Sequence, residues 1–235
     1  MIGSLLSRAV KRSFSVPHIG WLWLLAIALF TGTEYGFIWA DSAEQSDASF
    51  AALIIPYSLI ILFALWKASR VIGQAPSSQK GAVGPWIGWN GVGTLLVFAT
   101  AMILPLTGWN QDESLSSTLM TSLFFACSMA VMVPFFIHAT GRAINFGGPS
   151  VRVVLAYCRP HWMVLIIAFL VLVVPSVFVS DLVRYFSPAR EGTPGIQNLV
   201  MLLSGVVSGA EFMVTTALLV IAYEDIVAAA PDEAT

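Results

Sequence analysis

The chain has 235 residues, of which 57% are hydrophobic and only 10% are charged. Soluble domains carry about 25% charged residues, and a soluble protein of this length could not bury so much apolar surface. The composition therefore excludes the soluble classes and, with a mean hydropathy of +0.84, predicts an integral membrane protein. The formal net charge of -2 is not informative about the class of protein, whereas the placement of the charges along the chain is informative about its topology.

The apolar stretches predict an all-α, polytopic transmembrane bundle of about six spans with about 20 residues in each span. Residues 1–18 precede the spans as a basic segment, which suits either a helix on the membrane surface or an unstructured tail. The expected spans are residues 20–40, 50–68, 86–107, 115–139, 161–180 and 197–223. The loops between them are too short for a separate domain, so residues 1–235 are expected to form a single transmembrane domain.

Prolines lie inside or near the ends of spans two to five, at Pro56, Pro105, Pro134 and Pro175. Transmembrane helices tolerate proline when neighbouring groups satisfy the freed carbonyls, so these positions predict kinks and helix contacts. Between spans four and five, residues 147–150 break the chain, and the segment after them is expected to be short and amphipathic.

The basic residues predict the orientation of the chain in the membrane. If the spans alternate in direction, nine of the eleven basic residues share one side: Arg8, Lys11, Arg12, Lys67, Arg70, Lys80, Arg142, Arg152 and Arg159. Only Arg184 and Arg190 fall on the opposite side. By the positive-inside rule, both termini are cytoplasmic, and a bacterial inner membrane is the expected location. The number of spans depends on hydropathy, and the orientation depends on charge.

Glu34 and Glu211 are the only ionisable residues well inside the expected spans. A charge at this depth costs about 2.5–3.5 kcal/mol on insertion scales and marks a functional site by default. One interpretation is a polar cavity for a proton, a cation or a cationic substrate. The other is that each residue is a neutral acid bonded to nearby hydroxyls, such as those of Thr31, Thr33, Ser208 and Thr215.

Two glycine pairs have the spacing of small-residue packing faces, Gly32 with Gly36 and Gly205 with Gly209. Such faces let two helices approach closely, and contacts within one chain are favoured over a dimer interface. At about 100° per residue, Glu211 lies about 200° from Gly209 around the helix. The carboxylate is therefore expected to point away from the glycine face.

Three arginines after span four, Arg142, Arg152 and Arg159, could meet lipid phosphates or an acidic face of a partner, although a role in topology alone is the simpler interpretation. His18, His138 and His161 share one depth at the inner ends of spans. They could bind a metal or haem, but histidine is also common at membrane interfaces. No metal and no cofactor are expected.

From Met129 onward, the residues that carry a resemblance are Arg142, Pro149-Ser150, Arg159-Pro160-His161-Trp162 and Ala222-Tyr223-Glu224-Asp225. Their order resembles the broad group of bacterial six-span proteins that includes YciC and the membrane domain of glycerophosphodiester phosphodiesterases. The resemblance covers less than half of the chain. It implies a membrane module without enzymatic activity.

The function expected first is that of a non-catalytic accessory, scaffold or assembly component of a larger membrane complex. Membrane lipids and membrane proteins are its expected partners, and nucleic acid is not. The sequence has no metalloprotease motif and no phosphate-binding loop. The alternative is a small transporter or permease subunit that uses Glu211, with or without Glu34.

Overall fold

A computed structural model describes residues 2–17, 19–42, 47–76, 81–101, 115–145, 148–186 and 194–229. This part of the chain is helical and contains no strand, as the sequence predicts. The helices are α1 (Ile2–Ser15), α2 (Gly20–Ser42), α3 (Asp47–Ile72), α4 (Val83–Ala101), α6 (Leu115–Val131), α7 (Val133–Ile144), α8 (Val151–Phe186) and α9 (Pro194–Ala229).

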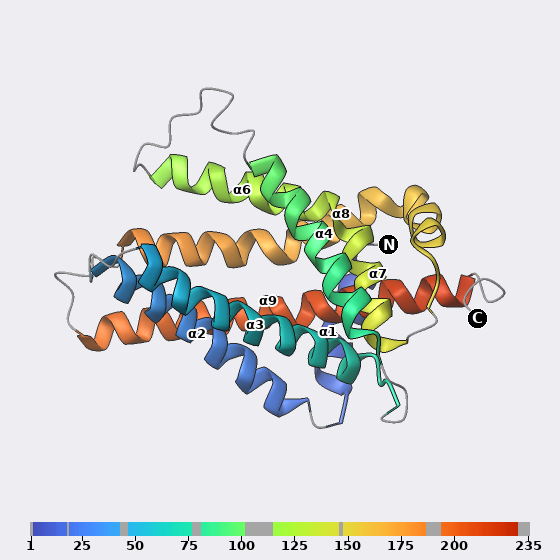
Figure 1. Cartoon of the computed structure of the whole chain (residues 1–235), viewed down its shortest axis with the longest axis horizontal. Coiled ribbons are helices and arrows are strands. Elements are labelled where there is room, and N and C mark those ends of the chain that lie inside the picture. Colours follow the sequence, from blue (N-terminus) through green and yellow to red (C-terminus); the bar gives the residue numbers. More distant parts are fainter. Residues whose placement is uncertain are drawn as a thin grey trace.

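Helix α9 is the centre of the bundle. Helices α1, α2, α3, α7 and α8 all pack against it, and α6 packs along α8 (Figure 1). Residues 213–223 of α9 are buried without interruption, which is typical of a helix surrounded by other helices. The N-terminal helix and the end of α9 lie at the same end of the molecule (Figure 1). We call it the basic end, because it carries Arg8, Arg12, Arg70, Arg142, Arg152 and Arg159.

Two helices are long and apolar enough to cross a membrane by themselves, Val151–Val183 of α8 and Asn198–Ala229 of α9. Two bent pairs also qualify when each is taken as one span: α1 with Gly20–Thr33, bent by 104°, and α6 with α7, bent by 58°. The described residues therefore contain two candidate spans, or up to four with the bent pairs. These findings support a helical membrane protein, and the count of six stays a prediction.

The bend between α6 and α7 lies inside the predicted span 115–139. Helix α6 ends at Val131, and α7 begins at Val133 with Pro134 in its first turn. A proline is well tolerated there, because the first amides of a helix have no partner within it. The kink expected near Pro134 is thus a break between two helices.

Helix α8 begins at Val151, earlier than the predicted start of span five at residue 161. It continues through both Pro160 and Pro175. A proline inside a helix removes one hydrogen bond and bends the helix, and it need not end it. The first turns of α8 run at an angle to the rest of the helix (Figure 1), so the segment after residue 150 belongs to the same element as the span.

Candidate functional site

Four serine hydroxyls join α8 to α9. Ser176 donates a hydrogen bond to Ser208 over 3.3 Å. The hydroxyl of Ser180 lies 3.2 Å from that of Ser204 and 3.3 Å from that of Ser208. Three of the four side chains are buried, and that of Ser180 is half-buried. Since each hydroxyl can both donate and accept, the four groups form a connected chain between the two longest helices.

Glu211 lies on the same face of α9 as this chain of hydroxyls. Ser204, Ser208, Glu211 and Thr215 are spaced by four, three and four residues, which places them in one row along a helix. The hydroxyl of Thr215 donates a hydrogen bond of 3.1 Å to the Glu211 carboxylate. The side chain of Glu211 is half-buried. We call this row, together with Ser176 and Ser180, the polar stripe.

Asp181 is a second carboxylate beside the polar stripe, and the sequence analysis missed it. The predicted span ended at residue 180 and placed Asp181 in a loop, but α8 continues to Phe186. Asp181 therefore lies within the helix, next to Ser180, and is only 6% exposed. The apolar pair Leu182-Val183 that follows was the signal that the helix goes on.

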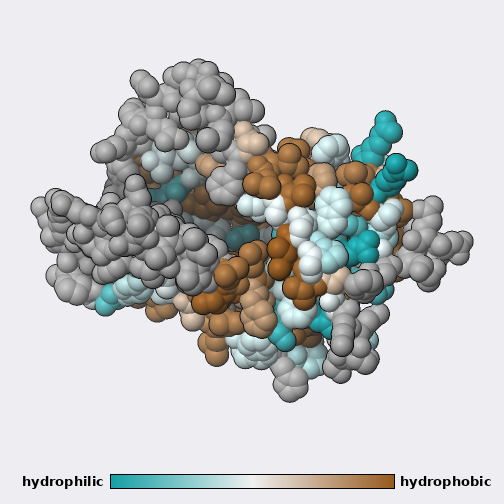
Figure 2. All heavy atoms as spheres, viewed as in Figure 1, coloured by the Kyte–Doolittle hydropathy of each residue, from teal (hydrophilic) through white to brown (hydrophobic). Residues whose placement is uncertain are grey.

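One face of the molecule is hollowed (Figure 2). In this view, hydrophobic surface borders part of the hollow, and hydrophilic atoms are visible inside it.

Gly205 and Gly209 lie where α9 packs on α2. A Cβ atom added at Gly205 would lie 2.8 Å from the Cβ atom of Thr31, and one at Gly209 would lie 3.0 Å from Cγ1 of Ile27. Real Cβ atoms essentially never show contacts shorter than 3.0 Å, so the close approach of α9 to α2 requires glycine at position 205. The two glycines therefore serve contacts within the chain, away from the polar stripe.

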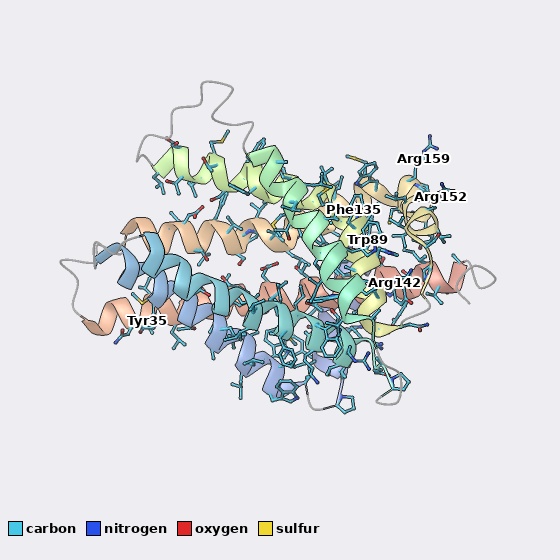
Figure 3. All side chains as sticks on the ribbon, in the orientation of Figure 1. Tyr35, Trp89, Phe135, Arg142, Arg152 and Arg159 are labelled. Carbon is cyan, nitrogen blue, oxygen red and sulfur yellow. The ribbon has the colours of Figure 1, made fainter. Side chains whose placement is uncertain are left out.

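The other predicted pair and Glu34 belong to the later part of α2. The side chain of Glu34 lies outside the described residues. Gly32 and Gly36 are exposed, and a Cβ atom at Gly36 would meet nothing within 4 Å among the described atoms. The neighbouring Tyr35, labelled in Figure 3, donates a hydrogen bond of 2.6 Å to Asn198 and so joins α2 to the start of α9.

At the basic end, the terminal acidic pair of α9 binds arginines of α1. Arg8 donates two hydrogen bonds to Asp225, of 3.1 and 2.8 Å, and this contact raises the pKa of the Arg8 guanidinium above its ordinary value. Arg12 donates to Glu224 over 2.8 Å and to the backbone carbonyl of Ile72, at the end of α3, over 3.0 Å. Helix α1 is thus fixed to the bundle by contacts with two other helices.

Tyr223, the residue before this acidic pair, fills a niche formed by two glycines. A Cβ atom at Gly141 would lie 2.6 Å from Cδ2 of Tyr223, and one at Gly148 would lie 2.8 Å from its hydroxyl oxygen. Each residue of the Tyr-Glu-Asp sequence that carries the resemblance therefore has its own neighbours at the basic end.

The three arginines named as candidate contacts to lipid phosphates or a partner lie apart. Figure 3 shows Arg152 and Arg159 projecting outward from the first turns of α8, while Arg142 lies on α7 nearer the interior of the bundle. Arg152 and Arg159 are exposed, and Arg142 is half-buried. Contact with lipid phosphates or a partner stays a prediction, and the structure brings only Arg152 and Arg159 onto one helix.

His138 is only 3% exposed and meets Trp89 edge to face, with ring centroids 4.9 Å apart. Phe135 stacks on the same tryptophan at 6.0 Å (Figure 3). His161 packs against Tyr157 at 5.2 Å, and His18 lies outside the described residues. Within the described part of the chain, no group of three or more histidine, cysteine or acidic residues is placed to hold a metal.

No family model, curated protein or solved structure matches the chain. The resemblance to the YciC-like group therefore stays a prediction that depends on the quoted residues.

Proposed function

We propose that the protein moves a proton or a small cationic solute across the membrane, alone or as a subunit of a larger permease. The observation that carries this proposal is the polar stripe, in which Glu211 and Thr215 continue a row of hydroxyls between α8 and α9. Glu211 is the group proposed to bind the proton or cation.

The physical chemistry of the polar stripe supports this proposal. A carboxyl group in a transmembrane helix is costly, and such groups typically mark proton relays and ion pathways. Hydroxyl groups can pass a proton along a chain or replace water around a cation, because each one donates and accepts. The proposal requires Glu211 to exchange a proton or cation with its surroundings, and the residue is partly exposed.

Purified protein in lipid vesicles tests the proposal directly. A potential imposed with valinomycin drives protons into vesicles that contain a pH-sensitive dye. Protons should enter the vesicles with the protein faster than the same vesicles without it. Na⁺ gradients are tested in the same format. Glu211→Gln should abolish the difference, because the amide cannot take up a proton. Glu224→Gln is the matched control on the same helix and should keep the wild-type rate. Transport by Glu211→Gln at the wild-type rate would refute the proposal.

A second proposal is the accessory role in a larger membrane complex. It is favoured by a row of glycines on α4, at Gly84, Gly88 and Gly91, where added Cβ atoms would meet nothing within 4 Å among the described residues. Small residues in such a row allow a partner helix to approach. On blue-native gels of native membranes, Gly88→Leu should dissociate a complex that Gly195→Leu, also at an open glycine, leaves intact.

We also propose six spans in a bacterial inner membrane, with both termini in the cytoplasm. The direct contacts between Arg8 and Asp225 support the placement of the two terminal helices on one side. The gathering of six arginines at the basic end supports its assignment to the cytoplasmic side.

A further inference from the structure

An open groove of about 720 Å³ lies at the basic end, separate from the polar stripe. Its walls come from the turn after α1, from the last turns of α3 and from the start of α4, and include Val16, Trp66, Lys67, Arg70 and Val83. This volume is in the range of small-molecule sites, about 300–1,000 Å³. The groove is large enough for the head group of a phospholipid.

Two cations of the groove lie on aromatic rings. The ammonium nitrogen of Lys67 lies 5.7 Å from the ring centroid of Phe63 and 5.4 Å from that of Trp66. The guanidinium carbon of Arg70 lies 5.3 Å from the Trp66 ring. Arg70 is further held by hydrogen bonds to the carbonyls of Ala143, at 2.9 Å, and Pro76, at 3.3 Å. Such contacts fix the position of a cation without neutralising its charge.

Lys67 differs from the arginines of α1 in its partners. Arg8 and Arg12 have acidic partners at 2.8 Å, whereas within the described ranges no carboxylate lies within 4.0 Å of the Lys67 ammonium. The groove thus presents a positive charge that attracts an external anion.

The face of α3 that carries Lys67 becomes apolar away from the basic end. Leu59, Phe63 and Lys67 follow each other at intervals of four residues and share one side of the helix. Leu59 is 61% exposed and Phe63 is 57% exposed. A cation at the membrane interface and an apolar strip that leads from it into the membrane match the two parts of a phospholipid.

From this arrangement we infer that the groove binds one anionic phospholipid, with its phosphate at Lys67 and an acyl chain along Leu59 and Phe63. Anionic lipids attract basic residues at the membrane surface, and the aromatic rings below Lys67 hold it at that depth. This inference is independent of the proposed transport activity.

Native mass spectrometry of the full chain in mild detergent tests the inference with added palmitoyl-oleoyl phosphatidylglycerol and, separately, phosphatidylcholine. The wild type should bind the first phosphatidylglycerol at least about fivefold more tightly than phosphatidylcholine. Lys67→Gln should weaken that binding about fivefold, as expected for one basic residue at an anionic surface. Lys67→Arg should restore it, and Lys11→Gln, the same change at an exposed lysine of α1, should leave it unchanged.

Four results would overturn the inference. The first is equal binding of the two lipids by the wild type, and the second is binding of phosphatidylglycerol by Lys67→Gln as tight as that of the wild type. Equal losses in Lys67→Gln and Lys11→Gln would show attraction by the whole basic surface instead of a site. Displacement of phosphatidylglycerol by millimolar glycerol 3-phosphate would assign the groove to a soluble anion.

Discussion

The niche around Tyr223 gives a quantitative test of packing at the basic end. The Tyr223 side chain is 5% exposed, and a Cβ atom at Gly141 would lie 2.6 Å from its Cδ2 atom and 3.1 Å from its Cζ atom. The ring cannot simply move away, because Gly148 approaches its hydroxyl from another segment. We therefore expect Gly141→Ala to overpack the niche, a kind of change that costs about 1–3 kcal/mol.

A matched control isolates this packing cost from the gain in helix propensity. Replacing glycine by alanine inside a helix gains up to about 1 kcal/mol. Gly88→Ala gains the same amount without a clash, because its Cβ atom would meet nothing within 4 Å in the described structure. The difference in the free energy of unfolding between Gly141→Ala and Gly88→Ala should therefore be about 1–3 kcal/mol.

Unfolding in mixed micelles with increasing SDS, followed by far-UV circular dichroism, measures this difference. A double-mutant cycle with Tyr223→Leu, which removes the ring, identifies its cause: the penalty of Gly141→Ala should shrink in that background. The reasoning fails if Gly141→Ala is as stable as Gly88→Ala. It also fails if the penalty is the same with and without the Tyr223 ring.

Three further predictions concern the attachment of α1, the contact between α2 and α9, and topology. Arg12→Gln should lower the free energy of unfolding by about 1.5–3 kcal/mol, since it removes charge-assisted hydrogen bonds to two helices. Arg8→Gln, at a more exposed ion pair, should lower it by no more than about 1 kcal/mol. SDS titration compares the two variants, and equal losses of stability would contradict this ranking. Gly205→Val should prevent the close approach of α9 to α2 and abolish a monodisperse peak in size-exclusion chromatography, while Gly36→Val should keep it. If both termini lie in the cytoplasm as proposed, fluorescent-protein fusions at either terminus should fluoresce and alkaline phosphatase fusions should be inactive. An active phosphatase at either terminus would refute the proposed orientation.

Hydropathy predicted the helices because long apolar runs have few other stable states in a membrane. It was less informative about where the helices end. The predicted span five began at residue 161, directly after Pro160, yet α8 begins at Val151 and continues through this proline. Pro134 predicted a kink, but a break between two helices at Met132 depends on packing around both of them. Asp181 was missed for the same reason, since its place in a helix depends on where α8 ends.

Side-chain partners were beyond prediction from a single sequence. Arg8 and Asp225 are 217 residues apart, and no periodicity or spacing relates them. The positive-inside rule counts basic residues in loops and does not identify their partners. It therefore treated Arg8 and Lys67 alike, although only the first of them has an acidic partner in the described structure.

The two regions of α9 differ in the strength of their contacts, and this difference decides how a transport defect would be interpreted. At the basic end, Glu224 and Asp225 form ion pairs, and Tyr223 is enclosed by two glycines. In the polar stripe, α8 and α9 are joined by hydroxyl contacts, and polar contacts between transmembrane helices are worth only about 0.6 kcal/mol on average. Glu211 adds one hydrogen bond within α9 itself. Replacing its carboxylate by an amide should therefore cost little stability, so a loss of transport in that variant would reflect the lost chemistry of the carboxyl group.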